Sequence, residues 1–338
     1  MNQSTMKHYA MGIDFGSTTA KTVILDLKGR IVAARVSHMG AVSGDGVRAS
    51  IEGALQDAGL TQEQVGRVVS TGYGRRMLDI ADKNYTEITC HARGAVAMVP
   101  DARLVIDIGG QDSKVIAVDA NGLVSQFAMN DRCAAGTGKF LETLARAMQV
   151  DLKDMGGIAL DATETLKISS MCATFAETEV ISLLAEGKSK PDVLGAVHAA
   201  IASRTMGLVG RVGKKGPVVM TGGVAKNVAA VHYIQKELGL PLHLPNDPQI
   251  AGALGAALLA LDDYRAEHKS EMTTLLADDD AFEAQMLADK ACAPNCKGDP
   301  ILAAALAKAT PAAAPAPAPE LNVPEGKKSL WQRIQSHI

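Results

Sequence analysis

The same polar turn between two apolar strands occurs twice in this chain. The first copy is an apolar strand ending in IDFG, at residues 9–16, followed by a second strand at residues 20–26. The second copy, residues 102–118, repeats the order strand, aspartate, glycine turn and strand around DIGGQD. Segments with helical and strand periodicity alternate after each copy, which is typical of α/β proteins. The repeat therefore predicts an α/β fold with two lobes, each built on one hairpin, and a cleft between them.

Apolar periodicity predicts the remaining elements and their division into domains. We expect strands at residues 65–74 and 217–220, and helices at residues 46–59, 139–148, 175–185, 192–212, 225–238 and 251–261. The first lobe is expected over residues 9–110 and the second over residues 111–264. Residues 265–338 are predicted to form a low-complexity extension that is partly disordered. They begin charged, and residues 302–319 are almost entirely Ala and Pro, which cannot bury enough apolar surface to offset the entropy of ordering.

Composition excludes several classes of protein. The 34 basic and 37 acidic side chains leave a formal charge of −3, which argues against a nucleic-acid-binding surface. The five cysteines are scattered through a long chain, as in proteins of a reducing compartment. The N-terminal residues are polar, and no run approaches the roughly 18 apolar residues of a membrane span. We therefore expect a cytoplasmic protein that binds neither nucleic acid nor a membrane.

The two hairpin turns have the composition of phosphate-binding loops. Glycine and hydroxyl residues let backbone N–H groups approach phosphate oxygens, because no bulky side chain intervenes. Asp14 can orient a hydrated Mg²⁺ ion at the end of its strand, and the second turn faces it with Asp107. Asp107 or Gln111 is expected to position an attacking water, and Lys21 to neutralise phosphate charge. The other expected binding residues are Gly16, Ser17, Thr18, Gly109 and Gly110, with Gly222 and Gly223 from a third glycine turn.

Cys133 and Cys172 each lie at the start of a predicted helix. The partial positive charge and unpaired N–H groups of a helix N-terminus stabilise a thiolate, so two such thiolates could hold an electron-carrying metal cluster. Their separation in the sequence matches no zinc-binding spacing, and a lone buried cysteine is usually a small apolar residue. Cys90 is expected to be such a core thiol, and Cys292 and Cys296 remain unassigned.

Longer motifs around these residues resemble known proteins. The segments GIDFGST (12–18), DIGGQD (107–112) and TGGV (221–224) resemble the actin, sugar-kinase and heat-shock ATPase superfamily. Three further segments are similar to those of the ATPase activators of 2-hydroxyacyl-CoA dehydratases and the related ATPase subunits of benzoyl-CoA reductases. They are TGYGR (71–75), NDRCAAGTGKF (130–140) and SMCATFAETEVI (170–181). The resemblance extends over residues 12–261.

This resemblance implies two ribonuclease-H-like lobes, as in actin-like ATPases, with ATP and Mg²⁺ in the cleft between them. It also implies an electron pump in which two subunits share one [4Fe-4S] cluster and each provides two cysteines, here Cys133 and Cys172. By the same resemblance, Asp14 and Asp107 handle magnesium and phosphate, Ser17, Thr18, Gly109 and Gly110 contact phosphate, and Gly222, Gly223 and Asn227 lie on the nucleoside side.

The resemblance also implies partners. The chain is expected to act as a homodimer, or as a pseudo-dimer with a related ATPase subunit. A low-potential ferredoxin or flavodoxin is the expected electron donor, and an acyl-CoA dehydratase or reductase component is the expected acceptor.

Two other functions are compatible with these residues. A small-molecule kinase of the same fold replaces the attacking water by a substrate hydroxyl, and a nucleotide-dependent scaffold binds ATP without catalysis. Both leave the two cysteines without a role. Within the resemblance, a benzoyl-CoA reductase subunit and a dehydratase activator both remain open. The extension favours the subunit, because a tail can anchor it in a lasting complex, whereas the motifs match the activators uniformly.

Overall fold

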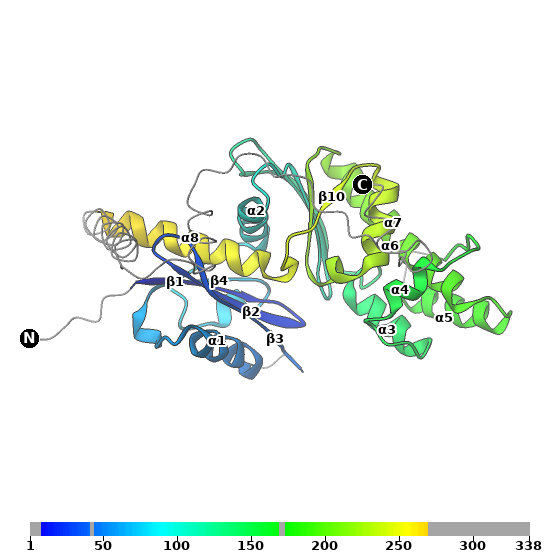
Figure 1. Cartoon of the computed structure of the whole chain (residues 1–338), viewed down its shortest axis with the longest axis horizontal. Coiled ribbons are helices and arrows are strands. Elements are labelled where there is room, and N and C mark those ends of the chain that lie inside the picture. Colours follow the sequence, from blue (N-terminus) through cyan, green and yellow to red (C-terminus); the bar gives the residue numbers. More distant parts are fainter. Residues whose placement is uncertain (1–7, 41–43, 169–172, 270–338) are drawn as a thin grey trace, which may run out of the picture. The chain divides into compact units, whose positions relative to one another are not determined.

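Two five-stranded sheets carry the fold (Figure 1). The computed structural model describes residues 8–40, 44–168 and 173–269. The first sheet contains β1 (Tyr9–Phe15), β2 (Thr19–Asp26), β3 (Ile31–His38), β4 (Val65–Thr71) and β5 (Lys83–Asn84). The second contains β6 (Leu104–Ile108), β7 (Ser113–Val118), β8 (Val124–Asn130), β9 (Val218–Thr221) and β10 (Leu242–His243). The strand orders, β3-β2-β1-β4-β5 and β8-β7-β6-β9-β10, are equivalent. This confirms the expected α/β fold with a repeated hairpin in each lobe.

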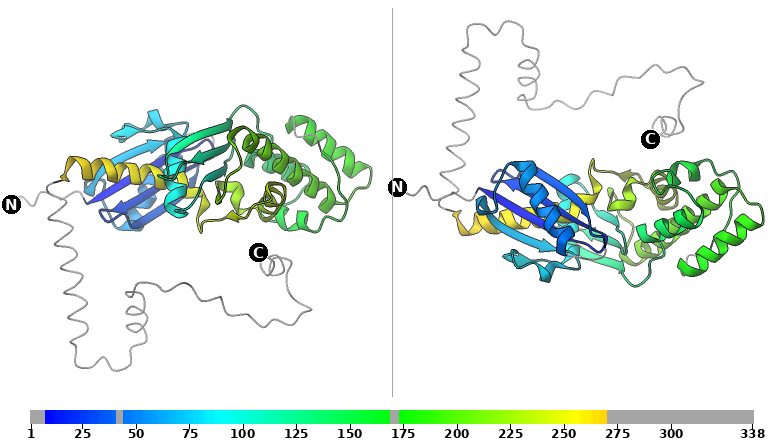
Figure 2. Two further views of the ribbon diagram at one scale, coloured as in Figure 1. Left: turned by 90° about the horizontal axis from the view of Figure 1, so that it is seen from above. Right: turned by 90° about the horizontal axis from the view of Figure 1, so that it is seen from below.

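Helices cover both faces of each sheet. In the first lobe, α1 (Gly44–Ala58) and α8 (Ala251–Glu267) lie on opposite faces, as the two views of Figure 2 show. In the second lobe, α2 (Glu87–Met98) lies on one face, and α6 (Lys190–Val212) and α7 (Val228–Leu238) lie on the other. The remaining helices are α3 (Gly138–Ala147), α4 (Met155–Leu160) and α5 (Ala173–Ala185). Because β1 is covered on both sides, it is a continuous apolar run rather than an alternating one.

Each connecting helix leaves one sheet and packs on the other. Helix α2 follows β5 of the first sheet but packs on the second, and α8 follows β10 of the second sheet but packs on β1 and β4 of the first. The two helices pack against each other between the sheets. At Gly94 a Cβ atom would lie 1.8 Å from the carbonyl oxygen of Ala251, and at Gly255 it would lie 1.8 Å from that of Cys90. Only glycine permits this approach of the two backbones.

Because α2 and α8 pass from one sheet to the other, the limits of the two lobes differ from those expected from the sequence. Residues 104–108 are expected in the first lobe from the sequence, but they form the central strand of the second sheet. Residues 251–264 are expected in the second lobe, but they cover the first sheet, where a Cβ at Gly12 would lie 2.1 Å from the carbonyl oxygen of Ala253. A strand belongs to the sheet with which it forms hydrogen bonds, and a helix to the surface that it buries. Residues 270–338, with the predicted alanine–proline tract, lie outside the described residues.

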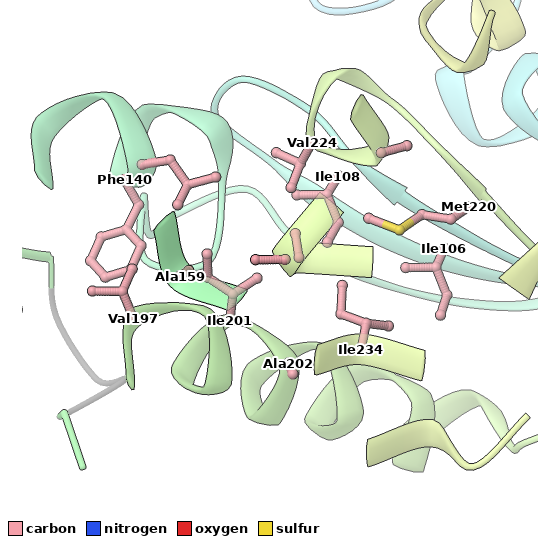
Figure 3. Close-up of a cluster of buried hydrophobic side chains, with 14 of the residues drawn as sticks. Ile106, Ile108, Phe140, Ala159, Val197, Ile201, Ala202, Met220, Val224 and Ile234 are labelled. Atoms are coloured by element: carbon pink, nitrogen blue, oxygen red, sulfur yellow. The ribbon is translucent and has the colours of Figure 1, made fainter. Parts of the chain in front are cut away.

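The core of the second lobe lies between its sheet and α6 (Figure 3). Ile106 and Met220 from the strands face Ile201 and Ile234 from the helices, and all four side chains are buried. In the part of the chain that the structure describes, α6 is the one helix with the length and apolar composition of a membrane span. Most of it is buried in this core, as is typical of a central helix in a globular lobe.

Candidate functional site

A cavity of about 510 Å³ lies where the turns of the two sheets approach each other. The β1–β2 turn and the β6–β7 turn both line it, together with the turn after β9 and the N-terminus of α2. The predicted site residues that line it are Asp14, Gly16, Ser17, Thr18, Lys21, Asp107, Gly109, Gly110, Gly222, Gly223 and Asn227. The structure therefore brings these residues of three separate turns into one place.

The glycines of these turns are required by close contacts. A Cβ atom at Gly110 would lie 2.2 Å from Oγ1 of Thr18, so the tips of the two hairpins touch each other. Gly222 has a φ of +86°, and a Cβ there would lie 2.3 Å from the carbonyl oxygen of Ile108. Because no side chain covers it, the backbone of such turns can approach a ligand closely. The N–H of Gly222 itself donates to the carbonyl oxygen of Pro248 at 2.9 Å.

Asp14 and Lys21 form the charged pair of the first turn. Asp14 is 3% exposed, and its Oδ2 atom accepts a hydrogen bond from Nζ of Lys21 at 3.0 Å. Burial by itself would raise the pKa of the Asp14 carboxyl, but Lys21 and then His91 outweigh it and hold the pKa below its usual value. The carboxylate is therefore ionised at neutral pH and available to a cation.

The second turn repeats this pair in a more buried setting. Asp107 is 1% exposed, and its carboxylate lies 3.4 Å from Nζ of Lys114 and 3.2 Å from Nδ1 of His91. Thr221 donates a hydrogen bond to the same carboxylate at 2.8 Å. Burial opposes ionisation of Asp107, but His91 and Lys114 hold its pKa well below its usual value. Both hairpins thus present an ionised aspartate and a lysine to one cavity.

Lys114 was not predicted from the sequence, although the repeat contains a signal for it. Asp14 and Lys21 are directly opposite each other in the β1–β2 pairing, and Asp107 and Lys114 are directly opposite each other in the β6–β7 pairing. Nζ of Lys114 lies 2.8 Å from Asp112 as well, so the ammonium group is surrounded by carboxylates. Burial by itself would lower the pKa of Lys114, but these carboxylates raise it. Lys114 is therefore the residue of the second hairpin that is equivalent to Lys21 of the first.

Glu87 and His91 are further residues that the sequence did not suggest. Both come from α2, whose N-cap Thr86 accepts a hydrogen bond from the backbone N–H of Thr89 and so places Glu87 at the first helical position. Glu87 is 8% exposed, and its Oε1 atom accepts no hydrogen bond from the described residues, although it lies 3.8 Å from Nζ of Lys114. Burial raises the pKa of Glu87 above its usual value, and Lys114 opposes the shift only in part. A carboxylate in this setting is suited to accept a proton.

Two predicted residues have positions that the sequence did not suggest. Gln111 is exposed and does not line the cavity, whereas its neighbour Asp112 does. Asn227 lines the cavity and is also the N-cap of α7, since its Oδ1 atom accepts hydrogen bonds from the N–H groups of Ala229 and Ala230. The assigned role of Gln111 in positioning water remains a prediction.

Of the cysteines, Cys133 and Cys90 are described. Cys133 is half-buried in the loop between β8 and α3, and Asn130 donates a hydrogen bond to its carbonyl oxygen at 2.8 Å. Cys172, Cys292 and Cys296 lie outside the described residues. Cys90 is fully buried, and burial raises the pKa of its thiol to about 12, which suits the expected core role. Within residues 8–40, 44–168 and 173–269, no group of three or more His, Cys, Asp or Glu side chains is placed to hold a metal ion.

Comparison with known proteins assigns the family. Residues 11–260 match the BadF/BadG/BcrA/BcrD ATPase family. The chain is 46% identical to the activator of lactoyl-CoA dehydratase from Anaerotignum propionicum over 261 residues, 77% of this chain and 99% of the relative. It is 34% identical to a benzoyl-CoA reductase subunit from Thauera aromatica over 263 residues, 73% of this chain and 91% of the relative.

A solved structure extends the likeness to the fold. The activator of the 2-hydroxyisocaproyl-CoA dehydratase from Clostridium difficile, solved with bound ADPNP, is 42% identical and has a TM-score of 0.73. The alignment covers 78% of this chain and 97% of that structure. The two-lobed architecture is that of the actin-like ATPases. The chain therefore belongs to the BadF/BadG/BcrA/BcrD ATPase family, and its relatives include dehydratase activators and a component of a benzoyl-CoA reductase.

Proposed function

We propose that this protein is an ATP-hydrolysing iron–sulfur protein that drives single-electron transfer to an acyl-CoA enzyme. The observation that carries the proposal is the pair of hairpin turns that present Asp14 and Asp107 to one cavity of about 510 Å³, a size suited to a small ligand. The higher identity to a dehydratase activator, 46%, than to a benzoyl-CoA reductase component, 34%, favours a 2-hydroxyacyl-CoA dehydratase as the partner.

The residues of the cavity have separate tasks in nucleotide binding. Asp14 and Asp107 are proposed to hold a hydrated Mg²⁺ ion together with the phosphates, because both carboxylates are ionised and line the same cavity from different turns. Lys21 and Lys114 offset the negative charge of the phosphates. N–H groups and hydroxyls of Gly16, Ser17, Thr18 and Gly110 bind the phosphate oxygens. Gly109 lines the same site, where its N–H donates to the carbonyl oxygen of Asp112 and so shapes the turn. Gly222, Gly223 and Asn227 lie on the nucleoside side.

Glu87 is proposed to orient and deprotonate the attacking water. Glu87→Gln is expected to lower the rate of ATP hydrolysis by about 10²-fold or more, while ATP still binds, because the amide cannot accept a proton. The pKa of Glu87 is raised above 4.5, so the wild-type rate should fall as the pH drops through that raised pKa and the carboxylate becomes protonated. Steady-state hydrolysis and ATP binding measured across pH test this.

The matched control for Glu87 is Glu237→Gln, the same change at an exposed position of α7 outside the cavity. It should leave both the rate and the pH profile unchanged. A wild-type rate and a wild-type acid limb in Glu87→Gln would show that another group handles the water.

The cysteine chemistry fits a cluster that two chains share. A [4Fe-4S] cluster needs four thiolates and supplies single electrons at low potential. Cys133 is half-buried in a polar loop, unlike the fully buried Cys90, so its thiolate can reach a second chain. Cys133 and Cys172 are the proposed ligands from each chain, with a homodimer or a related ATPase subunit providing the other two. A low-potential ferredoxin or flavodoxin is the proposed donor of electrons.

Iron content tests the proposed function directly. Protein purified without oxygen is expected to contain about two irons per chain, and Cys133→Ala or Cys172→Ala is expected to lose them. Cys90→Ala serves as the control, because its core thiol should leave the iron content unchanged. Iron-free wild-type protein from an anaerobic preparation would exclude the electron pump and favour a small-molecule kinase or a nucleotide-dependent scaffold.

A further inference from the structure

Helix α3, which directly follows the loop that contains Cys133, is bonded to the proposed phosphate-binding turn of the second lobe. The backbone N–H of Gly138 donates to the carbonyl oxygen of Gly109 at 2.9 Å, and that of Lys139 donates to the carbonyl oxygen of Gly110 at 2.7 Å. Gly138 and Lys139 are the first residues of α3, whose N–H groups have no partner within the helix. The N-terminus of α3 is therefore attached to the peptide groups of the β6–β7 turn.

Two side chains attach the same loop to the end of the β7–β8 hairpin. Ser113 donates from its hydroxyl to the carbonyl oxygen of Gly136 at 3.2 Å, and Asn130 donates from Nδ2 to the carbonyl oxygen of Cys133 at 2.8 Å. Ser113 and Asn130 are paired residues of neighbouring strands. We call these two residues the loop clamp. One of its members immediately follows the β6–β7 turn, and the other immediately precedes the Cys133 loop.

The β6–β7 turn and the Cys133 loop are tightly packed and hydrogen-bonded. Ser113 is 5% exposed, and Gly109 donates from its N–H to the carbonyl oxygen of Asp112 at 2.9 Å, which closes the turn on itself. Gly136 has a φ of +86°, and a Cβ there would lie 3.0 Å from Cδ of Arg204. A segment that is closely packed and has its backbone groups hydrogen-bonded moves as one unit. A displacement at the turn is therefore expected to displace the loop as well.

We propose that Ser113 and Asn130 are positioning residues that make the Cys133 thiol respond to the nucleotide. The inference rests on the proposed function, because it requires phosphate at the Gly109–Gly110 turn. Phosphate bound to this turn through the N–H of Gly110 reorients its peptide groups, and the carbonyl groups of Gly109 and Gly110 hold the start of α3. The loop clamp then transmits the displacement to Cys133. Ser113, on the strand that leaves the turn, holds the end of the loop at Gly136, and Asn130, its paired residue on β8, holds Cys133 itself.

The reactivity of the Cys133 thiol in the full-length protein, freed of iron with a chelator, tests this proposal. Iodoacetamide labelling of Cys133 is followed by peptide mass spectrometry with and without Mg²⁺ and ADPNP. One buried hydrogen bond shifts an equilibrium by about fivefold, so a change of about fivefold in the wild-type labelling rate is expected on nucleotide binding. Ser113→Ala and Asn130→Ala are each expected to reduce this change to less than about twofold, with unchanged affinity for ADPNP.

Two further variants test whether the effect comes from the hydrogen bond of the Ser113 hydroxyl or from a general loss of structure. Ser113→Thr keeps the hydroxyl and should retain the wild-type response. Ser125→Ala removes another serine hydroxyl of the same strand pair, which donates to the carbonyl oxygen of Ala117 at 3.2 Å on the exposed side, and should also retain it. A wild-type protein that binds ADPNP without any change in Cys133 labelling would overturn the proposal, as would a full response in both alanine variants. Because iron has been removed, these outcomes do not depend on the iron content that tests the proposed function.

Discussion

Asp107→Asn is expected to lower the rate of ATP hydrolysis by about 10³-fold, the largest effect on activity at any position of the cavity. The substitution removes the charge that compensates Lys114 and His91 and that is proposed to hold Mg²⁺. The amide still fits beside Thr221, so the loss comes from charge rather than from shape. The rate is measured under saturating Mg²⁺–ATP, together with a thermal melt, because breaking a buried ion pair is destabilising as well.

Asp119→Asn is the control for this substitution. It makes the same chemical change in the β7–β8 turn, where Oδ1 of Asp119 accepts hydrogen bonds from the N–H groups of Asn121 and Leu123. Asparagine is also well suited to such turns, so the rate should stay near the wild-type value. Hydrolysis near the wild-type rate in a folded Asp107→Asn protein would contradict the proposed role of Asp107.

Gly94→Ala is expected to lower the free energy of unfolding by about 3 kcal/mol, because it overpacks a contact that cannot relax. The added Cβ would lie 1.8 Å from the carbonyl oxygen of Ala251, so α2 and α8 must separate. The neighbouring atoms are backbone rather than the end of a flexible side chain. Urea denaturation followed by circular dichroism measures the change.

Gly207→Ala is the control, and it is expected to raise the free energy of unfolding where Gly94→Ala lowers it. Gly207 is exposed on α6, and a Cβ there would meet nothing within 4 Å. Alanine should therefore stabilise the protein by about 0.5–1 kcal/mol through helix propensity. Equal effects at Gly94 and Gly207 would mean that the α2–α8 contact does not limit stability.

Some elements could be predicted because their own residues carry the signal. Each predicted strand and helix corresponds to an element of the structure, and the long α6 was located to within a few residues. Strand β3 was missed because it is an edge strand with a mixed exposure pattern, and α2 because its packing face is formed largely by small residues. The limits of the two lobes could not be predicted, because they depend on which sheet each segment packs on.

The site shows the same division. Asp14 and Asp107 could be predicted because each ends an apolar strand next to a glycine turn. Glu87 and His91 could not, since they come from a helix whose position depends on its contact with α8. Gln111 and Asp112 are adjacent in the turn, and only the fold of that turn decides that Asp112 faces the cavity while Gln111 faces solvent.

The sequence by itself determined the repeated hairpin, the two aspartates and the family, because these depend on residue order within short segments. The tertiary structure decided which sheet α2 and α8 cover, that Glu87, His91 and Lys114 meet Asp107 in one cavity, and that the start of α3, after the Cys133 loop, is bonded to the β6–β7 turn. The physical reason is that such contacts join residues far apart in the chain. Their formation depends on the burial of whole faces and the pairing of backbone groups, which no local pattern records.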